Sequence, residues 1–138
     1  AKAQELGYAE TDPTGDVEGW DAAGKVLILA NALFGRTLTM NDLEVEGITK
    51  ITAQDIADAQ QKNERYKLIA TATPDGGSVK PMRLPVDNPL ASVSGSTNAI
   101  TFQTDLMGDI TLIGAGAGKQ ETGYAILLDL LAIQRETR

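Results

Sequence analysis

The sequence predicts an α+β fold in which an antiparallel or mixed sheet is covered by helices on one side. Three observations lead to this prediction. Residues 20–34 form a long, mostly apolar stretch of helical length. Two β-rich runs, 65–73 and 78–84, flank a strong turn signal. A second apolar stretch, 119–135, has the length and composition of a helix near the end of the chain.

The first long helix is delimited by residues that interrupt regular structure. Residues 7–19 contain a proline and several glycines, and we expect a loop there. Residues 1–6 before it have the pattern of the end of a helix. Apolar residues dominate 20–34, so protein is expected to cover most of the circumference of this helix, which Gly35 ends.

The middle of the chain is predicted to hold a short helix and a hairpin. Residues 39–46 are expected to be irregular or extended. The spacing of Thr52 and Asp55 is that of a capping box, which opens a helix to about Asn63. The runs 65–73 and 78–84 then pair through a Pro-Asp-Gly-Gly turn.

Proline constrains the second strand of that hairpin. Because Pro81 and Pro85 cannot donate to a ladder, this strand is expected at a sheet edge or bulged. Residues 86–96 are expected to be a loop with one helical turn. Two short β-rich runs follow, 99–103 and 110–113, joined by a turn with a glycine.

A glycine-rich loop over 114–118 precedes the last helix. It matches neither a dinucleotide fingerprint nor a phosphate-binding P-loop, and such a pattern alone is more often a tight turn. The leucine-rich part of the helix, 124–133, is expected to bury one face. With 138 residues, the chain has the size of one domain, so we expect residues 1–138 to form a single domain.

Charge and composition exclude several classes of function. A net charge of −7 argues against binding to nucleic acid or to an anionic membrane surface. The chain has no cysteine and no histidine, which removes disulfides, thiol catalysis and the usual zinc sites. Carboxylates and lysines are left for proton transfer, and we expect no metal.

No stretch of the sequence suggests a membrane or secretory destination. No apolar run reaches membrane-spanning length, and no signal peptide is visible. A cytoplasmic location is therefore expected. The chain begins with alanine instead of methionine, which fits either a processed start or an excised fragment.

Acidic residues gather before the first long helix, where Lys2 is the only cation. Such a cluster is either a solvated loop or a site for cations or ammonium groups. A calcium site is disfavoured because the spacing is not that of an EF-hand. The cluster consists of Glu5, Glu10, Asp12, Asp16, Glu18 and Asp21.

One ion pair is predicted at the start of the helix. Asp21 and Lys25 stand four residues apart and therefore lie on one helical face. Such pairs usually lie on the surface and contribute little to stability, and the pattern alone favours that interpretation. A lysine between a polar loop and an apolar helix can also serve as an acid or base.

The whole string from residue 7 to residue 25 resembles the substrate-site segment of homoserine dehydrogenases. That segment runs Gly-Tyr-x-Glu-x-Asp-Pro-x-x-Asp-x-x-Gly-x-Asp-x-x-x-Lys. A motif with so many fixed positions is far more specific than a single loop fingerprint. The matching residues are Gly7, Tyr8, Glu10, Asp12, Pro13, Asp16, Gly19, Asp21 and Lys25.

The resemblance continues along nearly the whole chain. The family also shows a Gly-x-Gly-Ala-Gly loop followed by threonine and an apolar helix, as in residues 114–131 here. Three intervening segments are similar as well: 46–51, 84–91 and 95–100. Gly123 stands where the family commonly has alanine, and Gly24 is an unusual helix residue before the lysine.

The resemblance implies a function for several residues. It implies that Lys25 is the acid/base, held by Asp21, and that Glu10, Asp16 and Asp21 bind the substrate. The reaction would interconvert L-homoserine and L-aspartate 4-semialdehyde with NAD(P). The cofactor would be bound mainly by a Rossmann domain outside this chain, in an enzyme expected to be a homodimer. Its nicotinamide would lie beside Gly114, Gly116, Ala117 and Gly118.

Two features of such enzymes are missing from the sequence. We find no dinucleotide fingerprint after a first strand, and no Asn-Gly-Thr-x-Asn-Tyr segment. We therefore expect the C-terminal portion of a longer enzyme, inactive alone. The alternative is a non-catalytic dimerisation or ligand-binding module, in which the acidic residues form only a solvated rim.

Overall fold

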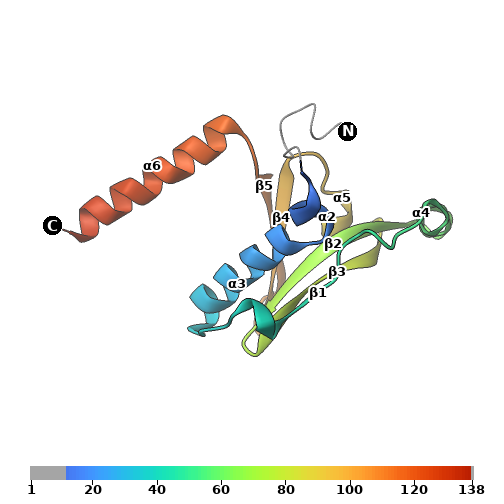
Figure 1. Cartoon of the computed structure of the whole chain (residues 1–138), viewed down its shortest axis with the longest axis horizontal. Coiled ribbons are helices and arrows are strands. Elements are labelled where there is room, and N and C mark those ends of the chain that lie inside the picture. Colours follow the sequence, from blue (N-terminus) through green and yellow to red (C-terminus); the bar gives the residue numbers. More distant parts are fainter. Residues whose placement is uncertain (1–11, 138) are drawn as a thin grey trace. The chain divides into compact units, whose positions relative to one another are not determined.

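The computed structural model describes residues 12–137, which fall into two compact units, 12–91 and 92–137 (Figure 1). The helix end expected at 1–6 lies outside the described residues. The α+β class is confirmed, but the strands form two separate sheets, one in each unit. No helix in the described part of the chain is long and apolar enough to cross a membrane.

The first unit is built from helices around a three-stranded sheet. A short helix occurs inside the segment predicted to be a loop, so that part of the loop prediction is wrong. The elements are α2 (Thr14–Val17), α3 (Trp20–Phe34), the 3-10 turn η1 (Met40–Asp42), β1 (Leu43–Val45), α4 (Ala53–Gln61), β2 (Glu64–Thr73), β3 (Gly76–Pro85) and α5 (Pro89–Ser92).

The sheet of this unit is mixed, with the strand order β1-β3-β2. The predicted hairpin is confirmed: β2 and β3 pair antiparallel from Thr73 opposite Gly76 onward. β1 runs parallel to β3 but pairs only as far as Val79. β3 is thus central in its first part and, within the described residues, an edge beyond it, where Pro81 and Pro85 need no second ladder partner.

Helix α3 lies across one face of this sheet (Figure 1). Ala23 and Val26 are buried against Val79 of β3, and partly buried side chains from β1 and β2 surround them. Together with Ala30, they follow the spacing of a single helical face. This contact is the core of the unit.

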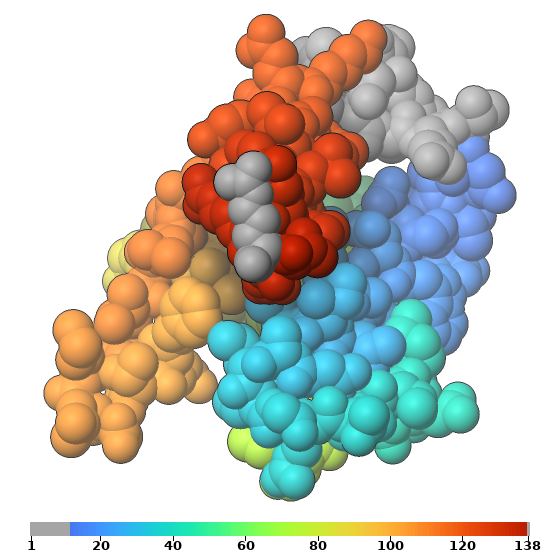
Figure 2. Space-filling view, turned by 90° about the vertical axis from the view of Figure 1, so that its left-hand side faces the viewer, coloured from blue at the N-terminus to red at the C-terminus, as the bar shows by residue number. Residues whose placement is uncertain are grey.

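The expectation that protein covers most of α3 is wrong for this chain. Ile28 is 69% exposed, and Leu33 and Phe34 are also exposed. Figure 2 shows the cyan, C-terminal part of the helix at the surface. The reason is geometric, because a helix on one sheet face can bury only one of its own sides.

The capping box predicted for α4 is confirmed. The Thr52 hydroxyl accepts from the backbone N–H of Asp55 at 3.1 Å, and the Asp55 carboxylate accepts from that of Thr52 at 2.9 Å. η1 carries a similar box between Thr39 and Asp42. These local bonds satisfy backbone donors that have no partner within the helix.

The second unit holds the antiparallel pair β4 (Thr97–Thr104) and β5 (Gly108–Ala115), followed by α6 (Lys119–Glu136). Both strands and the last helix lie where the sequence predicted them. The burial predicted for one face of 124–133 is not found, since the described residues of α6 are all exposed. The predicted apolar face of α6 therefore has no packing partner among residues 12–137.

Candidate functional site

The predicted pair at the start of α3 is formed. Lys25 Nζ lies 2.6 Å from Asp21 Oδ2, and the two side chains are 61% and 54% exposed. The one-turn spacing in the helix brings the two groups together. Because both side chains are exposed to water, the pair contributes little to the stability of the fold. Its main effect is to fix the position of the Lys25 ammonium group.

Asp16 lies close in sequence but on a different element. It belongs to α2, and only Glu18 and Gly19 connect that helix to α3. Gly19 precedes the helix with φ of 88°, in the left-handed region that favours glycine. The chain can therefore turn sharply between Asp16 and the Asp21–Lys25 pair. Glu10 lies outside the described residues.

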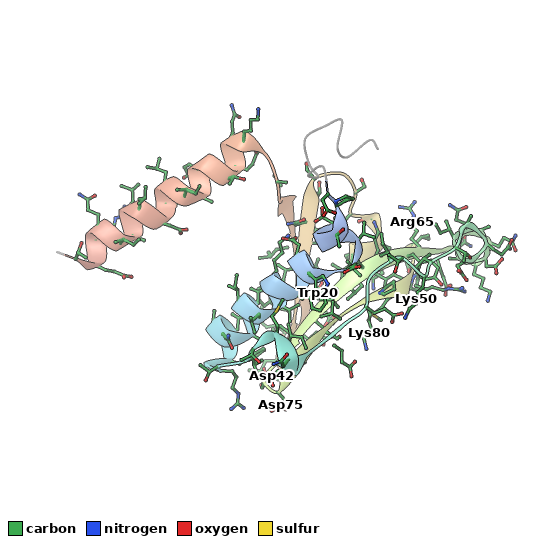
Figure 3. All side chains as sticks on the ribbon, viewed as in Figure 1. Trp20, Asp42, Lys50, Arg65, Asp75 and Lys80 are labelled. Atoms are coloured by element: carbon green, nitrogen blue, oxygen red, sulfur yellow. The ribbon has the colours of Figure 1, made fainter. Side chains whose placement is uncertain are left out.

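A shallow depression of about 410 Å³ opens beside the α2–α3 connection. Trp20 and Lys50, both labelled in Figure 3, belong to its lining. The Trp20 indole donates to the Glu18 carboxylate at 3.1 Å, and Lys50 Nζ lies 3.3 Å from a carboxylate oxygen of Glu46. The full lining is Glu18, Trp20, Val45, Glu46, Gly47, Thr49 and Lys50.

Sequence reasoning did not predict this depression. Residues 46–51 stood out only as a segment familiar from the resembled family. The contact between them and the α2–α3 connection joins positions about thirty residues apart. Local patterns in the sequence carry no direct signal for such a contact.

The glycine loop belongs to the second unit. The Gly116 N–H donates to the Ser96 carbonyl at 2.9 Å. A β-carbon on Gly116 would overlap the Asn98 side chain, whereas one on Gly114 would meet nothing within 4 Å. Ala117 is exposed. The loop is therefore held close to β4 at Gly116, lies against the Glu121 side chain at Gly118, and leaves the backbone of Gly114 open.

The electrostatics of the acidic segment are local. The hydroxyl and backbone N–H of Thr14 donate to Asp12, and these bonds hold the pKa of that carboxyl below its usual value. Asp12 is thus fixed as an anion just before α2. Within the described residues, no group of three or more acidic side chains is arranged to hold a metal ion.

Of the predicted site residues, the structure brings Asp21 and Lys25 into contact. Asp16 lies in the same unit, one short connection away, and the glycine-loop residues Gly114, Gly116, Ala117 and Gly118 lie in the other unit. Trp20, Glu46 and Lys50 are additions from the structure.

Solved structures place this fold among the dehydrogenases. A homoserine dehydrogenase from S. aureus superimposes with a TM-score of 0.85 at 38% identity, covering 99% of this chain and 36% of that one. A hyperthermophilic archaeal homoserine dehydrogenase mutant in complex with NADPH gives 0.79 at 32% identity, covering 98% and 39%. The fold is thus similar to one portion, about a third of the length, of these dehydrogenases.

Sequence comparisons specify the family. The homoserine dehydrogenase profile matches residues 1–131. The NAD(+)-dependent homoserine dehydrogenase of Pseudomonas canavaninivorans is 48% identical over 140 residues, and the homoserine dehydrogenase of Methanocaldococcus jannaschii is 43% identical over 137. These alignments cover 98% and 99% of this chain, but only 40% of either relative's length. The chain belongs to the homoserine dehydrogenase family.

Proposed function

We propose that this chain is the catalytic-domain portion of an NAD(P)-dependent homoserine dehydrogenase. The complete enzyme interconverts L-homoserine and L-aspartate 4-semialdehyde. The observation that carries the proposal is the Asp21–Lys25 contact of 2.6 Å at the start of α3. It joins the two residues that the family resemblance assigns to the reaction.

Lys25 moves the proton in this proposal. In its amine form, its nitrogen accepts the proton of the substrate hydroxyl while the carbon–hydrogen bond breaks. In the reverse direction, the ammonium returns that proton to the oxygen of the aldehyde. The nicotinamide, when bound, takes up or returns the hydride. Asp21 keeps the Lys25 nitrogen in place and compensates its charge when it is protonated.

The acidic segment positions the substrate. Homoserine carries an ammonium group, and carboxylates attract it without taking part in proton transfer. Asp16 on α2 and Asp21 on α3 lie on the two sides of a short connection, and we assign both to substrate binding. Glu10 receives the same role from the family resemblance.

The backbone left open at Gly114 is where the glycine loop would meet the cofactor. At Gly116 a β-carbon would fill the space that Asn98 occupies, and Gly114 leaves its backbone open. Small residues of this kind let a planar ring come close to the main chain. We assign Gly114, Gly116, Ala117 and Gly118 to the nicotinamide side of the cofactor.

The rest of the cofactor site lies in another part of the complete enzyme. Asp21 and Lys25 are more than half exposed, so further groups are needed to enclose a substrate. We propose a Rossmann domain that binds most of NAD(P), a homodimeric assembly and a cytoplasmic location. Two relatives point to the cofactor class: one is named as NAD(+)-dependent, and another was solved with NADPH.

A turnover assay tests this function. The complete protein that carries this chain is mixed with L-homoserine and NAD+ or NADP+, and the absorbance of the reduced nicotinamide is followed. We expect turnover by the complete protein and none by the 138-residue chain alone. If the complete protein binds homoserine but reduces neither cofactor, the chain is a ligand-binding module and the proposal is wrong.

A further inference from the structure

The position of α2 relative to α3 depends on a very short connection. Glu18 and Gly19 alone separate the end of α2 from the start of α3. The Gly19 N–H donates to the Asp16 carbonyl at 3.3 Å, and the Gly19 carbonyl accepts from Ala23 at 2.9 Å. Any displacement of this connection therefore changes the distance between Asp16 and the Asp21–Lys25 pair.

The segment after β1 holds this connection in place. The Ile48 N–H donates to the Val17 carbonyl at 2.9 Å. The Glu46 N–H donates to the Val79 carbonyl at 2.7 Å, which fixes the same segment to β3. The end of α2 is thus anchored to the central strand of the sheet through residues 46–48.

Gly47 is the closest point of this anchor. A β-carbon at Gly47 would lie 2.5 Å from the Glu18 Cα and nearer still to the Val17 carbonyl oxygen. Both are backbone atoms, which cannot rotate away as a side chain can. The φ of Gly47 is not positive, so the requirement for glycine there is one of space.

We propose that Gly47 is a positioning residue for the catalytic group. It allows residues 46–48 to pack directly on the α2–α3 connection. This packing fixes the position of Asp16 relative to Asp21 and Lys25. The inference rests on the proposed function for its kinetic consequence, but its geometric part stands apart from it. A methyl group at this position has to displace the connection by about 1 Å, a misplacement that can cost about 100-fold in rate.

The test compares two alanine variants. Gly47→Ala is compared with Gly15→Ala, which adds the same methyl group to α2 where it would meet nothing within 4 Å. The complete enzyme reports kcat and KM, and the 138-residue chain reports fluorescence. Trp20 is the only tryptophan of the chain and lies at the start of α3, so its emission reports on the connection directly.

For Gly47→Ala we expect three changes. The wavelength of the Trp20 emission or the extent of its quenching by iodide changes. In the complete enzyme, kcat falls about 10- to 100-fold, and KM for homoserine rises while KM for NAD(P)+ stays unchanged. Partial unfolding would lower the active fraction alone and leave both KM values in place. Gly15→Ala should match the wild type in every readout.

A second variant covers the case in which Gly47→Ala does not fold by circular dichroism. Val45→Ala keeps Gly47 but removes one of the two valine side chains beneath Gly19. It should show the same changes more weakly. If the variant that folds has wild-type Trp20 emission and wild-type kcat, the inference is wrong. If the wild type itself turns over no homoserine, the proposed function fails, and the Trp20 emission still decides the positioning role.

Discussion

At the scale of single residues, two exposed ion pairs have the same spacing in the sequence. Asp21–Lys25 and Glu46–Lys50 both join residues one helical turn apart in number, at 2.6 Å and 3.3 Å. Both pairs are largely exposed. Spacing and distance alone do not distinguish a catalytic ion pair from a surface ion pair that has no role in catalysis. What distinguishes the first pair is its place in a segment that the family resemblance links to the substrate.

The acidic residues lead to a prediction about substrate affinity. Replacing Asp16 by Asn, or Glu10 by Gln, in the complete enzyme should raise KM for homoserine more than it lowers kcat. The reason is that these carboxylates attract the substrate ammonium group in the ground state and the transition state alike. Steady-state kinetics measure both constants. Asp75→Asn, at the far hairpin turn of the same unit, serves as the control. A fall in kcat at unchanged KM would assign Asp16 to the chemical step.

At the scale of elements, short polar motifs fix where helices begin. In α4 the Thr52 hydroxyl and backbone N–H donate to Asp55, and these bonds hold the pKa of that carboxyl below its usual value. Thr39 acts on the pKa of Asp42 in the same way in η1. Both motifs are exposed, yet they satisfy backbone donors that would otherwise depend on water.

The capping boxes predict how stability depends on pH. A carboxyl whose pKa is lowered on folding stabilises the native state above its ordinary value of 3.8. That contribution is lost as the pH falls below 3.8 toward the native pKa. The urea midpoint should therefore fall over this range. Thr52→Ala should lower the free energy of unfolding at neutral pH by about 1 kcal/mol, and the urea midpoint with it. The variant should also show a weaker dependence of stability on acid pH. An unchanged dependence in this variant would contradict the assignment.

Local signals explain which elements could be predicted from the sequence. The Thr52–Asp55 spacing, the turn between β2 and β3, and the glycines around α3 all act within a few residues, and the structure follows them. The parallel pairing of β1 with β3 and the approach of Gly47 to Val17 depend on distant contacts. Periodicity and turn chemistry do not encode such contacts. The sequence therefore predicted the Asp21–Lys25 pair but not the packing of Gly47 against the end of α2.

At the scale of the whole molecule, much apolar surface is open. Within the described residues, β1, β2 and the part of β3 beyond Val79 have open edges in one sheet, and β4 and β5 have no further partner in the other. Open strand edges and apolar helix faces both favour association. Seven large apolar side chains of α6 are exposed: Tyr124, Ile126, Leu127, Leu128, Leu130, Leu131 and Ile133.

This surface predicts self-association of the 138-residue chain. Light scattering at increasing concentration should show a mass that rises above that of the 14.6 kDa monomer. Leu112→Lys places a charge on β5, where the native side chain is 58% exposed, and should reduce the association. A strictly monomeric mass up to high micromolar concentration, without aggregation on standing, would contradict an exposed pairing edge.

The most direct test of the proposed function is a pair of lysine substitutions in the complete enzyme. Lys25→Ala should lower kcat for homoserine oxidation by about 10²- to 10⁴-fold, the usual contribution of a positioned acid or base. Lys80→Ala removes another exposed ion pair, with Glu44 at 3.5 Å, and should leave kcat within about twofold of the wild type. Circular dichroism confirms that both variants fold. A Lys25→Ala enzyme with near-normal kcat would contradict the assignment of the proton transfer to Lys25.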